Sequence, residues 1–409
     1  MKKTRLALAI ATTAMASTPV LATNGDNMIG LGAKEISMGG TGAAGLHGAE
    51  GILNNASATA EVQGTEFNIA GTLFMPTIKT KAGGGPVATG EQTSKGDTYL
   101  IPAVSTATRI NDNLVFGIGM WGTAGMGTDY SQKNADGYGG QFDLSSNLQL
   151  MKFAPSLTYQ HSNFAIGVAP VLQYGALDIQ SDTSAFGGGN NGAGQSTDLG
   201  WGYTLGASYK IGSLKIGAAY DSAIDMKYED QISTQITAFK GLNPGITMTF
   251  DDHLEQPAQI KVGVAYDIGA FQIAADYKNI QWGDAKGYKD FGWENQNVYS
   301  LGVKFIQEQY WLAVGYNYGE NPIDEKDAST SANNAAKNFF NMALFPATSE
   351  SQFTFGGGYS LTQNMALDAA IMYAPQTKNT YDTTALGIAP SVTTKHEEMS
   401  YTVQLSYKF

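Results

Sequence analysis

Apolar and polar residues alternate one by one over the last thirteen residues of the chain, 397–409. A period of two is that of a β-strand whose two faces meet different surroundings. The segment also has the length of a tilted strand that crosses a membrane. One such strand would fit a secreted β-sandwich as well as a membrane protein. Its apolar face would carry Met399, Tyr401, Val403, Leu405, Tyr407 and Phe409.

The same alternation recurs along the chain, in segments that we interpret as strands. Six short turns and seven long loops would join them, with the long loops near 81–97, 128–146, 182–197, 230–256, 283–296, 320–350 and 377–396. Short periplasmic turns alternating with long extracellular loops are typical of outer-membrane barrels. The predicted strands are 65–80, 97–110, 113–127, 147–160, 163–181, 198–211, 213–229, 257–268, 270–282, 297–306, 309–319, 351–361, 364–376 and 397–409.

The composition agrees with this interpretation. Only 15% of the residues are charged, 50 of the 409 are Gly, and none is Cys. Ordinary soluble domains carry roughly 25% charged residues and about 7% Gly. The mean hydropathy of −0.17 is too polar for a protein that spans a membrane with helices. We therefore predict an all-β fold, a transmembrane antiparallel β-barrel of about 14 strands.

The N-terminal part of the chain does not alternate. Residues 1–22 join a basic start to a short apolar stretch and small residues, which predicts a secretory signal peptide. Residues 23–63 are rich in Gly and Ala, and 64–409 would form the barrel. A barrel of fourteen strands is wide enough to hold a small segment. We expect 23–63 to plug the lumen, although a disordered periplasmic tail is the alternative.

Six short motifs follow one another along the fourteen-strand pattern, namely NMIG at 27–30, SMGGTG at 37–42, LNNA at 53–56, DYKNIQW at 276–282, GYNY at 315–318 and FNMALFP at 340–346. In this order they resemble the FadL/TodX family of outer-membrane transporters of long-chain fatty acids and hydrocarbons. The resemblance covers the whole chain after residue 22. It implies that 23–63 are the family's N-terminal hatch, and that the C-terminal strand ending in Phe409 is read by the outer-membrane assembly machinery.

One motif departs from the family pattern. Asn54, Asn55 and Ala56 match the hatch motif Asn-Pro-Ala, except that Asn55 stands where the family has Pro. Pro fixes φ near −65° and lacks an N–H group, whereas Asn keeps the donor and tolerates turn geometry. We expect the turn to survive the exchange, and the variant Asn55→Pro to be tolerated.

The third predicted strand is a candidate lateral gate. The resemblance implies that ligand leaves sideways through the wall at this strand, next to the hatch. Glycine weakens a strand and marks bends or close backbone approach. By alternation Trp121 would face inward, while the neighbouring strand carries Pro102, which cannot donate to a ladder. Alternatively, the glycines only relieve curvature. The candidate gate residues are Gly117, Gly119, Trp121, Gly122 and Gly125.

Two apolar runs interrupt the long loops at 230–256 and 320–350. Exposed apolar patches call for a partner, so these residues are candidates for ligand binding outside the barrel. They could equally pack on one another as a lid. The candidates are Phe239, Leu242, Ile246, Met248, Phe250, Phe339, Phe340, Leu344 and Phe345.

From the resemblance we expect passive uptake of a hydrophobic molecule across the outer membrane of a Gram-negative bacterium. A fatty acid would want a cation near its carboxylate, for which Lys34 is a candidate, whereas a hydrocarbon would not. The alternative is a general diffusion porin or a structural, adhesive barrel. Outer-membrane lipid and lipopolysaccharide would surround the protein.

Other chemistry finds no support in the residues. The net charge of −12 argues against a nucleic-acid partner. The four His residues show no metal-ligand spacing, and no nucleophile motif such as G-x-S-x-G is present. We therefore predict no enzymatic activity, no metal and no cofactor.

Overall fold

The computed structural model describes residues 24–83, 90–131, 143–184 and 188–409. The predicted signal peptide at 1–22 lies outside the described residues. Among those that are described, no helix is long and apolar enough to cross a membrane.

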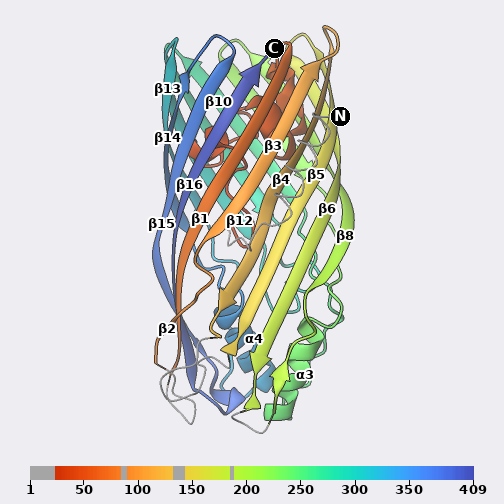
Figure 1. Cartoon of the computed structure of the whole chain (residues 1–409), viewed down its shortest axis with the longest axis vertical. Coiled ribbons are helices and arrows are strands. Elements are labelled where there is room, and N and C mark those ends of the chain that lie inside the picture. Colours follow the sequence, from red (N-terminus) through yellow and green to blue (C-terminus); the bar gives the residue numbers. More distant parts are fainter. Residues whose placement is uncertain (1–23, 84–89, 132–142, 185–187) are drawn as a thin grey trace, which may run out of the picture.

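Fourteen antiparallel strands close into one barrel, because β16 pairs with β1 along its whole length (Figure 1). Two further strands of two residues each, β2 (Gln92–Thr93) and β7 (Asn190–Asn191), extend the ladders at loop ends. The barrel strands are β1 (Thr65–Gly83), β3 (Tyr99–Arg109), β4 (Leu114–Asp129), β5 (Ser145–His161), β6 (Phe164–Asp182), β8 (Ser196–Ile211), β9 (Leu214–Asp221), β10 (Gln259–Ile268), β11 (Phe271–Ile280), β12 (Gln296–Ile306), β13 (Tyr310–Gly319), β14 (Ser351–Ser360), β15 (Met365–Asp382) and β16 (Ser391–Lys408).

The alternating pattern produces the two faces of the wall. In β16, Tyr401, Val403 and Leu405 are exposed on the outside, whereas Thr402 and Gln404 are buried inside. The apolar side chains that the wall exposes would face lipid, and the polar ones meet the contents of the lumen. The all-β prediction and the strand count are confirmed.

Two predicted boundaries were wrong. The strand predicted at 213–229 ends at Asp221, because residues 222–228 leave β8 and form isolated bridges to the segment before β10. Much of the loop predicted at 377–396 is strand, since β15 continues to Asp382 and β16 begins at Ser391. This part of the hairpin is rich in Thr and Lys, so it lacks the apolar face that marks a membrane strand.

The long connections fold over one end of the barrel, opposite the C-terminus (Figure 1). They contain α3 (Ile232–Leu242), α4 (Ala332–Ala343) and the short 3-10 helix η5 (Thr384–Leu386). The backbone of the turn after α4 is held by inward-facing wall side chains. Thr128 Oγ1 donates to the carbonyl of Ala343 at 2.7 Å, and Ser146 Oγ donates to that of Leu344 at 2.7 Å.

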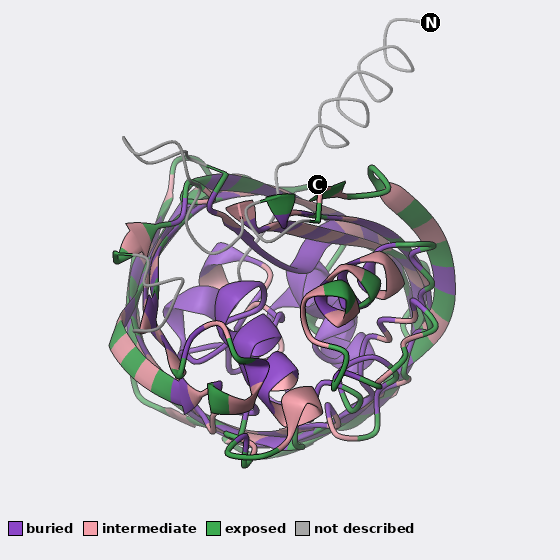
Figure 2. Cartoon of the chain, turned by 90° about the horizontal axis from the view of Figure 1, so that it is seen from below, coloured by how far each residue is buried: buried purple, intermediate pink, exposed green. Residues whose placement is uncertain are grey.

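The N-terminal segment, residues 24–63, lies inside the barrel, where its residues are almost all buried (Figure 2). It contains the short helix α2 (Ala33–Ser37) and two 3-10 helices, η1 (Gly48–Leu53) and η2 (Ala56–Glu61). Helix α2 packs on β14 and β15, while η2 packs on β5, β6 and β8. The segment therefore bridges opposite parts of the wall and plugs the lumen, as predicted.

Candidate functional site

The N-terminal segment packs directly against inward-facing glycines of the wall. A Cβ atom on Gly217 would lie 1.7 Å from the carbonyl oxygen of Ala43, and one on Gly206 would lie 2.0 Å from Asn55 Oδ1. Such distances leave no room for any side chain, so these glycines allow close backbone approach. The same holds for Gly167, Gly302, Gly315 and Gly356, which contact residues 37–39 or 56–57 of the segment.

The hatch motif forms a hydrogen-bonded turn at the centre of this contact. Asn55 Oδ1 accepts from the backbone N–H of Ser57 at 2.9 Å and so caps η2, which begins at Ala56. Its Nδ2 donates to the carbonyl of Ala43 at 2.6 Å. Asn54 donates through Nδ2 to Glu35, which ties the motif to α2.

The structure contradicts the expectation that Asn55→Pro is tolerated. Asn55 has φ −148°, far from the value near −65° that a proline ring imposes. Its backbone N–H also donates to the carbonyl of Gly51 at 2.9 Å, a bond that Pro cannot make. Asn55 thus fixes the turn with its side chain, by a geometry that a Pro residue could not adopt.

Buried carboxylates tie the segment together. Glu35 Oε2 accepts from the N–H of Leu31 at 3.0 Å, and Glu50 Oε1 accepts from the N–H of Glu35 at 3.1 Å. Burial raises the pKa of both carboxyl groups above their usual range. Lys34 lies 3.6 Å from Glu50 and 4.0 Å from Asp368 of β15, so this candidate cation is held in a structural ion pair.

Asp26 joins the start of the segment to the loops outside. Its Oδ2 accepts from Gln256 Nε2 at 2.6 Å and from the hydroxyl of Tyr288, and both donors belong to loop residues. Burial raises the pKa of Asp26 to about 6, against the opposing effect of these hydrogen bonds. Trp282 packs on Tyr288 with ring centroids 4.6 Å apart, which shields the contact from water.

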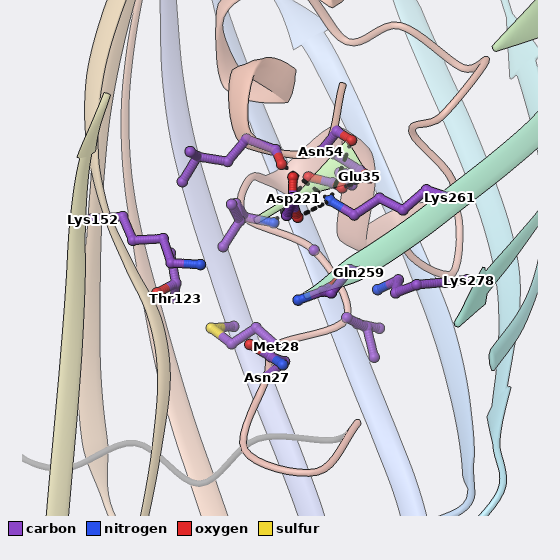
Figure 3. Close-up of a pocket in the computed structure, with 14 residues that line it drawn as sticks. Asn27, Met28, Glu35, Asn54, Thr123, Lys152, Asp221, Gln259, Lys261 and Lys278 are labelled. Atoms are coloured by element: carbon purple, nitrogen blue, oxygen red, sulfur yellow. Dashed lines mark hydrogen bonds and ion pairs between the residues drawn. The ribbon is translucent and has the colours of Figure 1, made fainter. Parts of the chain in front are cut away.

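A small pocket of about 50 Å³ lies between the N-terminal segment and the wall, below the range of roughly 300–1,000 Å³ typical of ligand pockets. Figure 3 shows side chains from β4, β5 and β9 to β11 converging on it. The apolar part of the lining is Met28, Ile29, Leu31 and Leu53. The polar part is Asn27, Glu35, Asn54, Thr123, Lys152, Asp221, Gln259, Lys261 and Lys278.

The three lysines of the pocket differ in their partners. Lys261 Nζ lies 2.7 Å from Asp221 Oδ2 and donates to the carbonyls of Leu53 and Asn54, so its charge is satisfied. Removing one partner of such a buried pair typically costs about 3–5 kcal/mol. Lys152 and Lys278 make no hydrogen bond or ion pair with any described residue, and they reach into the pocket from different strands (Figure 3). The pocket thus combines apolar surface with two unpaired cations.

The wall beside this pocket is incomplete. The ladder between β3 and β4 ends at the pair Ala103 and Trp121. The next residue of β3, Pro102, pairs with Gly71 of β1 and has no N–H to offer. Beyond this point the residues 122–128 of β4 are buried on both faces, so the strand has left the lipid-facing surface.

The N-terminal segment takes the place of β3 along this part of β4. The N–H of Met28 donates to the carbonyl of Thr123 at 3.1 Å, and the N–H of Gly125 donates to that of Asp26 at 3.0 Å. The ladder between β4 and β5 also shifts register between Gly122 and Ala124. On the edge that faces β3, the irregular stretch of β4 therefore takes hydrogen bonds from the plug, while its other edge pairs with β5.

The candidate gate residues fall into two groups. Gly117 and Gly119 lie within the regular ladder, and the indole of Trp121 covers Gly119 from the inside. Trp121 occupies the last rung. Gly122 and Gly125 lie beyond it, in the stretch that pairs with the N-terminal segment rather than with β3.

The apolar loop residues pack on one another. Phe239 of α3 contacts Phe340 of α4 with ring centroids 4.7 Å apart, and Phe250 stacks on Phe291 at 4.5 Å. Exposing a buried ring of this kind to water costs about 1.5–3 kcal/mol. Most of the set is buried, namely Phe239, Ile246, Phe339, Phe340, Leu344 and Phe345, and a half-buried rim consists of Leu242, Met248 and Phe250.

Sequence reasoning missed the two unpaired lysines. Lys278 stands within the motif at 276–282, and Lys152 stands in the fourth predicted strand, each at an inward position. A charged residue at an inward position of an otherwise apolar strand could have indicated each lysine as a candidate binding residue. It could not show which lysines lack a partner, because Asp221 and the carbonyls that satisfy Lys261 come from distant parts of the chain. Within the described ranges, no cluster of three or more His, Cys, Asp or Glu residues could hold a metal ion.

Comparison with known proteins agrees with this architecture. The chain is 22% identical over 342 residues to the 47 kDa outer membrane protein of Pasteurella multocida, which covers 76% of this chain and 77% of that protein. Its fold is that of the toluene transporter TodX of Pseudomonas putida, with a TM-score of 0.70, 20% identity, and 93% and 99% of the two chains covered. A FadL homologue of Pseudomonas aeruginosa gives a TM-score of 0.69 at 16% identity, with 96% and 100% covered.

The family profile described as "Outer membrane protein transport protein (OMPP1/FadL/TodX)" matches residues 7–409. The match spans the plug, the irregular β4 and the C-terminal strand, and it agrees with the closed barrel of fourteen strands. The family places the protein in the outer membrane of Gram-negative bacteria. The chain is therefore a member of the OMPP1/FadL/TodX family of outer-membrane transport proteins.

Proposed function

We propose that the protein takes up hydrophobic molecules passively across the outer membrane, and that its ligand carries an anionic head group, as a long-chain fatty acid does. The unpaired pair Lys152 and Lys278 carries the proposal. Two lysines that make no direct ion pair, beside apolar residues, suit a carboxylate with a hydrocarbon chain. The structural neighbours TodX of Pseudomonas putida and TbuX of Ralstonia pickettii are toluene transporters, and toluene would leave both charges unsatisfied.

Binding to purified protein tests the ligand class. Lys152→Met and Lys278→Met keep the apolar stem and remove the charge. A charge-assisted hydrogen bond contributes about 1.5–3 kcal/mol, so each variant should bind oleate roughly ten to a hundred times more weakly. Hexadecane affinity should not change. Lys210→Met, at an exposed position of β8, is the control. Equal losses for oleate and hexadecane, or no loss at all, would contradict an anionic head group.

The proposed route leads sideways through the wall, with the N-terminal segment acting as a hatch. The pocket touches Met28 and Thr123, the pair whose backbone bond replaces the missing β3 partner. Displacing the segment at this point would open a gap between β3 and β4 toward the membrane. We also propose that outer-membrane lipid and lipopolysaccharide surround the wall. The outer-membrane assembly machinery would read the C-terminal strand that ends in Phe409.

Adding bulk at the gap tests the route. A Cβ atom on Gly122 would lie 2.6 Å from Ile101 Cγ2 of β3, so Gly122→Val should fill the space between the two strands. We expect oleate uptake by cells to fall while binding to purified protein and heat-modifiable migration stay normal. Ala218→Val, on the exposed face of β9, controls for added bulk. Wild-type uptake rates in a well-folded Gly122→Val protein would exclude this exit.

A further inference from the structure

Lysines gather on the outside of the wall where β15, β16 and β1 lie side by side and extend toward the loop end of the barrel (Figure 1). In the register of these strands, Lys395 of β16 pairs with Lys79 of β1 on one side and with Lys378 of β15 on the other. Lys81 stands two residues beyond Lys79, on the same face of β1. Three neighbouring strands thus place four lysines in two adjacent rows, which we call the outer lysine cluster.

The outer lysine cluster points away from the lumen. Ile78 precedes Lys79 and His396 follows Lys395, and both of these neighbours are buried on the inner face. Because successive side chains of a strand point to opposite faces, all four lysines belong to the outer face. Each of them is half-buried or exposed, so the charges of the cluster are accessible from outside the barrel.

The cluster begins just beyond the apolar band of the wall. Tyr373, Met399 and Met75 form one row across the same three strands, on the same outer face. Lys395 lies four residues nearer the loop end of β16 than Met399, which is about 13 Å at the usual rise per residue. Glu397 stands between the two rows. The lysines therefore lie where an apolar wall gives way to water, and their long side chains can reach lipid head groups there.

The protein itself neutralises only part of the cluster. Like charges directly opposite one another destabilise a pair of strands. Among the described residues, the cluster makes one ion pair, in which Lys395 Nζ lies 2.6 Å from Glu91 Oε2. The chain has 36 Asp and Glu residues against 24 Lys and Arg, so acidic partners are plentiful in the sequence. Three of the four lysines nevertheless have no ion-pair partner in the described part of the chain, which indicates an external anion.

Glu91 shows how an anion meets the cluster. Its exposed carboxylate precedes β2, the short strand that pairs with β1 beside Lys79. The hydrogen bond from Lys395, together with the charges of Lys79 and Lys81, lowers the pKa of the Glu91 carboxyl group. One carboxylate is therefore stabilised by three lysines from two strands. A phosphate group carries more negative charge and three acceptor oxygens, so it would use the same lysines more fully.

We propose that the outer lysine cluster is a binding site for the phosphorylated head group of lipid A, the glycolipid that anchors lipopolysaccharide in the outer leaflet. The acyl chains would lie along the apolar rows of β15, β16 and β1, and the phosphates would meet the lysines beyond them. A basic cluster beside an apolar membrane surface is typical of sites for anionic lipids. The site lies on the outside of the wall, so the inference holds whichever hydrophobic molecule the barrel transports.

Titration of the purified protein in detergent with bis-phosphorylated lipid A, followed by native mass spectrometry, tests the site. In the double variant Lys378→Gln with Lys395→Gln, the affinity should fall about tenfold or more. The control Lys210→Gln with Lys408→Gln removes the same charge at exposed positions of the opposite rim and should bind as the wild type. Glu91→Gln removes the competing carboxylate and should bind roughly twofold to fivefold more tightly. Heat-modifiable migration shows that each variant is folded.

Two further probes separate the lipid from its parts. Lipid A without phosphates should bind weakly, and with the same affinity to every variant. Inorganic phosphate should displace bis-phosphorylated lipid A only at concentrations far above that of the lipid. The proposal is overturned if the cluster variant and the control bind bis-phosphorylated lipid A equally, or if inorganic phosphate displaces it at matching concentrations. Oleate binding should be the same in all these variants, so a failure of the wild type to bind oleate would count against the proposed function only.

Discussion

Asn55 shows that a motif can keep its position in the chain while a different residue fixes the backbone by a different means. The family residue Pro would set the backbone through its ring, whereas Asn55 sets it through hydrogen bonds to Ser57 and Ala43. Its φ of −148° is available to Asn and closed to Pro. The sequence alone suggested that the two residues are interchangeable here. The backbone conformation of Asn55 shows that they are not.

Asp26 should make docking of the N-terminal segment depend on pH. Its pKa rises from 3.8 to about 6 on burial, so the docked state binds a proton more readily than the free segment does. Docking should therefore strengthen as pH falls from about 7 toward 4, by an amount on the order of 3 kcal/mol. Hydrogen exchange at Gly125, whose N–H donates to Asp26, reports the change after correction for intrinsic rates.

The variant Asp26→Asn removes the titrating group and should remove this part of the pH dependence. Glu61→Gln, at a half-exposed carboxylate near the end of the segment, is the control and should behave as the wild type. If Asp26→Asn kept the full pH dependence of protection at Gly125, the carboxyl group of Asp26 would not be its source.

At the scale of elements, the two faces of the strands meet different surroundings, the membrane outside and the N-terminal segment inside. Their outer faces present large apolar side chains, whereas their inner faces carry glycines wherever the N-terminal segment approaches. The high Gly content is thus partly explained by the plug and not only by curvature of the wall. In β4 the plug also takes part in the backbone hydrogen bonding, because it supplies bonds that β3 does not.

A side chain at one of the wall glycines that contact the N-terminal segment should loosen the packing of the plug. In Gly217→Ala the new Cβ atom would overlap the carbonyl of Ala43, so the segment must shift. Single-channel conductance should rise, while heat-modifiable migration shows that the barrel still assembles. Gly71→Ala is the matched control, because its Cβ atom would make an ordinary contact of 3.7 Å with Leu100. A conductance as low in Gly217→Ala as in the control would mean that this contact does not seal the lumen.

For the molecule as a whole, the filled lumen argues against a general diffusion porin. The N-terminal segment and the loop helices α3 and α4 lie within or over the ring of strands (Figure 2). A water-filled channel of the porin kind needs an open interior. The family match and the plug instead support an outer-membrane transport protein.

The fold was readable from the sequence because a wall between lipid and lumen imposes a period of two on every strand. The alternation in β16 and the small residues of 23–63 each follow from a local rule, and both predictions were confirmed. The site was not readable in this way. Whether Lys152 is paired, where the ladder ends beside Pro102 and which lysines share a row on the outer wall depend on contacts between residues far apart in the chain. Register and closure of the barrel set those contacts, and no local pattern encodes them.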